Sequence, residues 1–315
     1  MWTSRRLSVA GFAGLLVVAA FLWAGSNERS ASLFIPPLRV ENVAAWQQRR
    51  LQFEDVAVAV LTSNRTVYEA IAAYNTWMTR SRAASAELVG STVWTSFPNK
   101  VHWYPWTLPY NTSQPIVLPP VKYIAVENED VFKARGATYA LYYLAQARPL
   151  AKWYMITNPS VFVVLPNLVA SLENVDESQP WIIGRSLPDS LLKPRMPGPG
   201  VLLSRPALLQ LLPEIKNCLG EWPDKLADDF LLRCARTVDS SIQTAHLAGQ
   251  YVGRATDITN DLRKYHPEGL VPFPISFMNI EPQDMYTYDY FLFQFKTHGP
   301  TDRADHRWSP CPDFM

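Results

Sequence analysis

The sequence predicts an α/β domain with a mostly parallel central sheet flanked by helices, behind an N-terminal membrane anchor. Residues 56–61 form an unbroken apolar run, which is typical of a strand buried on both faces. Apolar runs and helical patterns then alternate along the chain, the order found in one half of a mononucleotide-binding α/β fold. An uncharged apolar run at residues 7–25 predicts the anchor.

The composition excludes several classes of protein. The 315 residues suffice for one large domain or two modest ones. Lys and Arg number 29 against 28 Asp and Glu, so the chain lacks the basic charge expected of a nucleic-acid-binding protein. With 48% hydrophobic and 18% charged residues, the chain is too apolar to be disordered. Three cysteines are too few for a disulfide-dense scaffold.

The N-terminus predicts the compartment. Arg5 and Arg6 precede the apolar run, whose length is close to the roughly 20 residues that span a bilayer. Basic residues favour the cytoplasmic side, so residues 1–6 form a cytoplasmic tail and the rest is lumenal. This topology is that of a single-pass type II protein of the endoplasmic reticulum or the Golgi. The alternative is a cleaved signal peptide, with residues 24–26 as the cleavage site.

Two sequons agree with a lumenal location. Asn64 and Asn111 each begin an Asn-x-Ser/Thr triplet, and we expect both to accept N-linked glycans.

The lumenal chain divides into a stem, a domain and a tail. Residues 26–54 show no sustained period and form the stem, the domain covers residues 55–299, and residues 300–315 are a polar tail. Apolar runs predict strands, and apolar stripes at helical spacing predict helices. The strands are expected at 56–61, 88–96, 123–126, 153–156 and 161–165, and the helices at 66–82, 130–148 and 206–212.

General catalytic motifs do not occur in the sequence. The chain contains no phosphate-binding P-loop, no nucleophile elbow, no HExxH and no CxxC, and its five histidines are scattered. The residues alone therefore predict a lumenal α/β domain on a membrane anchor, and they do not indicate which reaction it would catalyse.

An ordered set of segments adds a resemblance. Residues 153–164 resemble the central motif of the fringe-like β1,3-glycosyltransferases (glycosyltransferase family 31), in particular the core 1 β1,3-galactosyltransferase branch. The resemblance implies a single GT-A-like glycosyltransferase domain. It continues in order over residues 198–208, 228–234 and 276–286, and upstream over 61–62 and 76–77.

The resemblance also implies a degenerate metal site. Active members carry three consecutive aspartates that hold Mn²⁺ against the diphosphate of a UDP-sugar. Here Asn158, Pro159 and Ser160 occupy those positions, and none supplies the carboxylate that a hard cation prefers. Met278 replaces the family's metal-binding histidine. We therefore expect no metal and no cofactor.

One acidic residue matches the family's catalytic position. Asp228 falls where active members place the carboxylate that deprotonates the acceptor hydroxyl. A general base contributes a factor of roughly 10²–10⁴ and does not replace a metal. The favoured interpretation is structural, in which Asp228 caps a helix start or forms an ion pair there, so no catalytic residue is assigned.

Non-catalytic relatives suggest the function. The core 1 branch includes a chaperone without the aspartate motif, and the proline at position 159 is shared with that form. The resemblance implies a chaperone or partner of core 1 β1,3-galactosyltransferase in mucin-type O-glycan synthesis. The alternative is an active enzyme that transfers galactose from UDP-galactose to GalNAc-Ser/Thr with an unconventional Mn²⁺ site. A third reading is another kind of pseudoenzyme, such as a sugar-binding module. The sequence does not decide whether the chain forms a homo-oligomer.

The resemblance pairs two of the cysteines. Cys218 and Cys234 match family cysteines that flank the acidic segment, and a bridge between them would close a loop of about 16 residues. An oxidising lumen permits such a bridge. Cys311 is left over, either free or paired between chains.

Overall fold

The computed structural model describes residues 33–35, 51–79, 86–91, 120–124, 126, 130–184, 198–251 and 273–294. The chain divides into two compact units, residues 1–33 and 34–315, and the second contains the fold described below. The predicted tail 1–6, anchor 7–25, most of the stem, Asn111, Cys311 and the tail 300–315 lie outside the described residues. Among the residues that the structure describes, no helix combines the length and apolar character needed to cross a membrane.

The main sheet is mostly parallel. From β9 to β4 its strand order is β9-β7-β8-β5-β2-β3-β4. Among the described strands from β9 to β4, β8 alone runs antiparallel to its neighbours, β5 and β7, which confirms the predicted sheet type. The strands are β2 (Val56–Thr62), β3 (Ala86–Ser91), β4 (Val121–Ile124), β5 (Trp153–Thr157), β7 (Trp181–Gly184), β8 (Val201–Ser204) and β9 (Gln243–Leu247), and β1 (Leu33–Ile35) spans the boundary between the units.

A second, three-stranded sheet is made of very short strands. It runs β10-β11-β6, with β10 parallel and β6 antiparallel to the central strand. The strands are β6 (Phe162–Val163), β10 (Gln250–Tyr251) and β11 (Ser276–Phe277).

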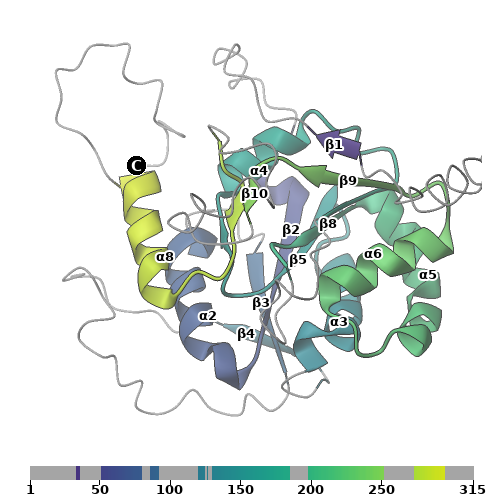
Figure 1. The fold of residues 1–315 in the computed structure, drawn as a ribbon, viewed down its shortest axis with the longest axis horizontal. Helices are drawn as coiled ribbons and strands as arrows, with labels where there is room; N and C mark the ends of the chain where they lie inside the picture. Colours follow the sequence, from purple (N-terminus) through teal and green to yellow (C-terminus); the bar gives the residue numbers. More distant parts are fainter. Residues whose placement is uncertain are drawn as a thin grey trace, which may run out of the picture. The chain divides into compact units, whose positions relative to one another are not determined.

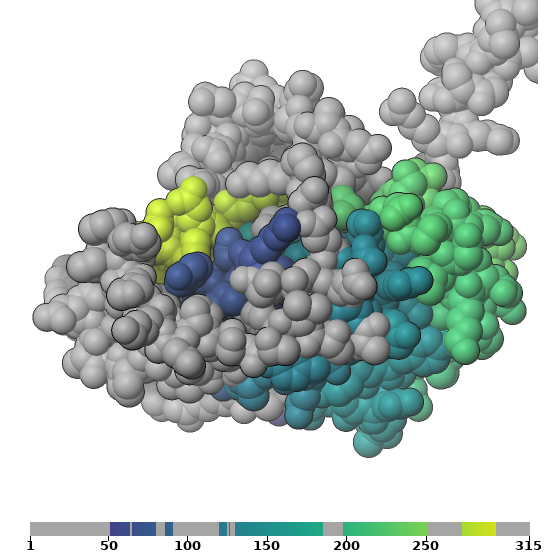
Figure 2. All heavy atoms as spheres, turned by 90° about the horizontal axis from the view of Figure 1, so that it is seen from below, coloured from purple at the N-terminus to yellow at the C-terminus, as the bar shows by residue number. Residues whose placement is uncertain are grey.

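Helices cover both faces of the main sheet (Figure 1). One apolar core contains residues of α2 (Val67–Ala73), α4 (Leu165–Leu172) and α8 (Pro282–Asp289). The other contains residues of α3 (Ala134–Ala147), α5 (Arg205–Glu221) and α6 (Ala227–Val238). α2 and α8 are in contact, and Figure 2 shows the blue residues, which include α2, beside the yellow residues, which include α8.

Strand β2 contributes to both cores. Val56, Val58 and Val60 pack into the first core, and the alternating Ala57, Ala59 and Leu61 pack into the second. Successive side chains of a strand point to opposite faces, so the unbroken apolar run is that of a strand between two helical layers. This confirms the prediction made from the run alone.

The helix predicted at 66–82 is interrupted. α2 ends at Ala73 and continues as a π-helical turn, Tyr74–Met78, in which Thr76 departs from helical geometry (φ −113°, ψ −107°). The Thr76 hydroxyl donates to the carbonyl of Ala72 at 2.6 Å. A hydroxyl bonded to the preceding turn competes with the helical ladder, and this is the local reason for the break.

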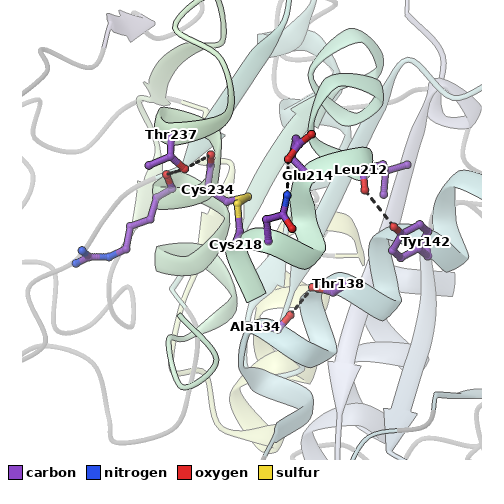
Figure 3. Close-up of a disulfide and its surroundings, with 10 residues drawn as sticks. Ala134, Thr138, Tyr142, Leu212, Glu214, Cys218, Cys234 and Thr237 are labelled. Atoms are coloured by element: carbon purple, nitrogen blue, oxygen red, sulfur yellow. Dashed lines mark hydrogen bonds between the residues drawn. A yellow bond between two sulfur atoms is a disulfide. The ribbon is translucent and has the colours of Figure 1, made fainter. Parts of the chain in front are cut away.

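The helix predicted at 206–212 is longer than expected. α5 runs from Arg205 to Glu221 and contains Pro213 in its interior. The Tyr142 hydroxyl of α3 donates to the carbonyl of Leu212 at 3.0 Å (Figure 3). Packing of α5 against α3 and the sheet therefore carries the helix past a residue that normally ends one.

Candidate functional site

Residues 158–160 of the predicted site follow the carboxyl end of β5. This strand lies between β2, which is parallel to it, and β8, which is antiparallel. Ile156 pairs with Val201, so residues 198–200 approach the same end of β5 from the opposite direction. Ligands of α/β sheets bind outside the carboxyl ends of the strands, and this edge is therefore the candidate site.

The Asn158 side chain is used to hold its own turn together. Its Oδ1 accepts hydrogen bonds from the backbone N–H of Ser160 at 2.9 Å and from the Ser160 hydroxyl at 2.6 Å. Its Nδ2 donates to the carbonyl of Gly198 at 3.3 Å. Asn158 is fully buried and Ser160 nearly so. An Asn that bonds the backbone two residues on forms an Asx-type turn, and here the turn is also tied to the glycine segment.

The peptide units of Gly198 connect Asn158 to Asp228. The Gly198 carbonyl accepts from Asn158, and the Gly198 N–H donates to Oδ2 of Asp228 at 2.9 Å. The resemblance assigns Asn158 to the metal site and Asp228 to the catalytic base. These two positions are therefore joined through one glycine.

Asp228 is a buried carboxyl in the first turn of α6. It is 3% exposed, and within the described part of the chain its Oδ1 has no hydrogen-bond partner. Burial raises the pKa of Asp228 from 3.8 to about 6, although the N–H of Gly198 acts in the opposite direction. A carboxyl in this range exchanges protons near neutral pH.

The ion pairs expected of Asp228 belong to its neighbour. The Nε of Arg233 donates a hydrogen bond to the Asp229 carboxylate at 2.9 Å, and the Lys225 ammonium lies 3.7 Å from the same carboxylate. Arg233 lies one turn along α6 from Asp229, and Lys225 lies just before the helix begins. Asp228 faces the glycine segment instead, a contact that the sequence reading missed because it depends on two segments 30 residues apart.

Met278 lies close to the same turn. The carbonyl of Ser160 accepts a hydrogen bond from the N–H of Ile280 at 2.9 Å, and Phe162 pairs with Phe277. Met278 is buried in the first apolar core. The structure therefore brings together both segments that the resemblance assigns to the metal site.

The residues present do not fit a Mn²⁺ site. Their side chains offer an amide whose oxygen already accepts two hydrogen bonds, a proline ring, a hydroxyl and a thioether. Hard cations prefer several carboxylate oxygens. Within the described ranges, no three His, Cys, Asp or Glu side chains are grouped so that they could hold a metal ion.

Gly200 sets the close approach between the glycine segment and β5. Its φ is +109°, a value that residues other than glycine rarely adopt. A Cβ at this position would lie 2.4 Å from Cε of Met155. The backbone conformation therefore requires glycine, and any larger residue would also displace the end of the Met155 side chain.

A disulfide fixes the helix that carries Asp228. Cys218 of α5 and Cys234 of α6 are bonded, with their Cα atoms 5.5 Å apart (Figure 3). These are the two cysteines that the resemblance pairs, and the bond links the two helices directly.

Of the predicted sequons, one lies within the described residues. Asn64 begins a short 3-10 helix, Asn64–Thr66, directly after β2. Asn111 lies outside the described ranges. Glycosylation at both positions stays a prediction.

No protein-family model matches the chain, and no curated protein matches its sequence. Several solved structures resemble it, among them the following two. One is a glycosyltransferase involved in glycosylation of the major capsid of PBCV-1, with 11% identity over 72% of this chain and 98% of that chain and a TM-score of 0.37. The other is the galactosyltransferase LgtC in complex with donor and acceptor sugar analogs, with 8% identity over 80% and 99% and a TM-score of 0.40.

Both similar structures are glycosyltransferases. Structural similarity at these TM-scores carries no argument about function.

Proposed function

We propose that this chain is a non-catalytic chaperone or partner of a core 1 β1,3-galactosyltransferase and supports mucin-type O-glycan synthesis. Its sequence motifs resemble in form those of the specific chaperone of that enzyme, Cosmc. The observation that carries the proposal is the Asn158 side chain, which is bonded to Ser160 and Gly198. The centre of the metal motif is thus a closed structural turn.

The chemistry of transfer supports this reading. A UDP-sugar donor develops negative charge on its leaving diphosphate, and a bound cation normally neutralises that charge. Asn158, Pro159, Ser160 and Met278 supply no charge at this edge of the sheet. A fold that keeps the turn but not the cation ligands suits recognition of a related protein better than turnover.

The proposal includes a location. A type II anchor at residues 7–25 and glycans at Asn64 and Asn111 would place the domain in the lumen of the endoplasmic reticulum or Golgi, where the client is made and used. The anchor stays a proposal from the sequence.

The test is an assay of the purified full chain with UDP-galactose and a GalNAc-bearing peptide, with and without Mn²⁺. We expect no galactose transfer in either condition. In parallel, deletion of the chain should reduce the activity of a core 1 transferase made in the same cells, and the two proteins should purify together. Clear turnover onto the peptide would contradict the proposal.

A second candidate function has one observation in its favour. Asp228 has a pKa of about 6 and an unpartnered oxygen, which are properties of a general base. Under this alternative the chain is an active galactosyltransferase-like enzyme with an unconventional metal site. Asp228→Asn would then abolish turnover, whereas under the chaperone proposal it leaves the client's activity unchanged.

A further inference from the structure

We propose that a buried water molecule bridges Gln250 and Ser276 in the small three-stranded sheet. This inference concerns a binding site away from the Asn158 turn and does not depend on the proposed function. It rests on the register of two strands, on the burial of two polar residues and on three side-chain atoms without partners.

The register brings the two side chains together. Strands β10 and β11 are parallel, and Gln250 is paired directly with Ser276. Paired residues of adjacent strands are about 4.8 Å apart, and their side chains lie on the same face of the sheet. The next residue of β11, Phe277, lies on the opposite face.

Both residues are completely buried, with 0% of their surface exposed. Within the part of the chain that the structure describes, Gln250 Nε2, Gln250 Oε1 and Ser276 Oγ have no hydrogen-bond partner. An unsatisfied buried polar group destabilises a fold, and native structures satisfy nearly all of them with protein or ordered water.

Water fits this set of atoms. A buried water typically makes about three hydrogen bonds, to donors and acceptors alike. The amide supplies both kinds of group, and the hydroxyl supplies either. An ion fits poorly, because neither side chain carries a charge that would balance it in a buried place.

The position gives the water a structural role. Ser276 of β11 is paired with Val163 of β6, beside the pair Phe162 and Phe277. Strand β6 follows the Asn158 turn, and β11 precedes Met278. A water that bridges β10 and β11 therefore stabilises β11 and, through it, its pairing with β6 beside the candidate site.

A double-mutant cycle in the full chain tests the proposal. Gln250→Met and Ser276→Ala are made singly and together, and the midpoint of urea unfolding is measured. With a bridging water, each single variant lowers the midpoint, because the remaining groups lose a shared partner. The double variant then loses less than the two single losses added together.

A dry pair of residues gives the opposite result. Removal of an unpaired buried polar group raises the midpoint, and the two effects add. Such an outcome overturns the proposal. If Gln250→Met does not fold, Ser276→Ala alone decides, since a lower midpoint supports a bridging water and an unchanged or higher one contradicts it.

A matched control lies in α3. The Thr138 hydroxyl is buried and donates to the carbonyl of Ala134 at 2.8 Å, so Thr138→Val removes a satisfied hydroxyl elsewhere. Its effect should add to that of Gln250→Met without coupling. A crystal structure of the full chain should show a water within hydrogen-bond distance of Gln250 and Ser276, and a protein side chain in that place would overturn the proposal.

Discussion

Asn158 both donates and accepts hydrogen bonds in this fold, which an ionised aspartate cannot do. Its amide donates to the carbonyl of Gly198, while its oxygen accepts two hydrogen bonds from Ser160. An aspartate keeps the acceptor but loses the donor. The residue that makes the metal motif degenerate is therefore also the residue that closes the turn.

Asn158→Asp should destabilise the protein at neutral pH. A carboxylate oxygen would then face the Gly198 carbonyl, and the loss should be about 1–3 kcal/mol in the free energy of urea unfolding. At a pH low enough to protonate the new carboxyl, the donor returns and most of the loss should disappear. Equal stability of variant and parent at pH 7 would show that the amide bond is unimportant.

Asp228→Asn should change how stability depends on pH. In the folded protein the pKa of Asp228 is about 6, which is above 3.8, the ordinary pKa of an Asp carboxyl that applies when the chain is unfolded. The stability that this group contributes is therefore fully present below about pH 3.8 and is lost as pH rises through about 6. Asparagine keeps an acceptor for the Gly198 N–H but never ionises. The variant should match the parent near pH 4 and exceed it at pH 8 by on the order of 3 kcal/mol.

Thermal or urea unfolding of both proteins across this pH range measures the difference. A stability difference that stays constant between pH 4 and pH 8 would contradict a raised pKa at Asp228.

At the scale of elements, two connections hold the candidate site in place. One is the close approach of residues 198–200 to the end of β5, and the other is the bond between α5 and α6. The first depends on a glycine, and the second on a disulfide.

Gly200→Ala should be strongly destabilising, and Gly220→Ala should not. At Gly200 an alanine meets both a positive φ and Cε of Met155, whereas a Cβ on Gly220 meets nothing within 4 Å. Gly220 lies in α5, where alanine is favoured over glycine by roughly 0.5–1 kcal/mol. Unfolding midpoints should therefore fall for the first variant and rise slightly for the second. Similar losses in both would contradict the strain at Gly200.

Removal of the disulfide should cost a predictable amount. Cys218 and Cys234 are 16 residues apart, and closing such a loop contributes about 3 kcal/mol in the chain-entropy account. The Cys218→Ala/Cys234→Ala double variant should lose about that much unfolding free energy. A reductant should bring the parent to the value of the variant and leave the variant unchanged, and a parent insensitive to reductant would argue against the bond.

At the scale of the whole molecule, four separate segments meet at one edge of the sheet. They are the turn at 158–160, the glycine segment at 198–200, the start of α6 and the segment after β11. The hydrogen bonds of Gly198 and Ser160 join them. Restoring one segment therefore leaves the others unchanged.

Aspartates at positions 158 and 160 alone should not create an active transferase. Asn158→Asp/Ser160→Asp supplies two carboxylates, but Met278 still offers a thioether, which binds Mn²⁺ poorly. UDP-galactose turnover with Mn²⁺ should stay at background. Addition of Met278→His to the pair tests whether the third ligand is what is missing, and activity of the first pair without it would show that Met278 does not matter.

The sequence predicted the long-range architecture where local patterns were strong. Strands β2 and β5 are apolar runs buried on both sides, and their position in the sheet follows from that pattern. The interruption of the first helix at Thr76 and the continuation of α5 past Pro213 were not predicted, because both depend on contacts that local periodicity does not contain. α4 was not predicted as a helix, because its residues were read only as part of a motif. A helix start at Asp228 was expected, and α6 begins at the preceding residue, Ala227.

The sequence by itself determined which chemical groups stand at the candidate site: an amide, a proline ring, a hydroxyl and a thioether at 158–160 and 278. Only the tertiary structure decided what those groups do. Asn158 and its partner Gly198 are 40 residues apart, and Gly198 and Asp228 are 30 apart. Contacts over such separations depend on the antiparallel register of β8 and the packing of α6, and no local pattern of residues encodes them.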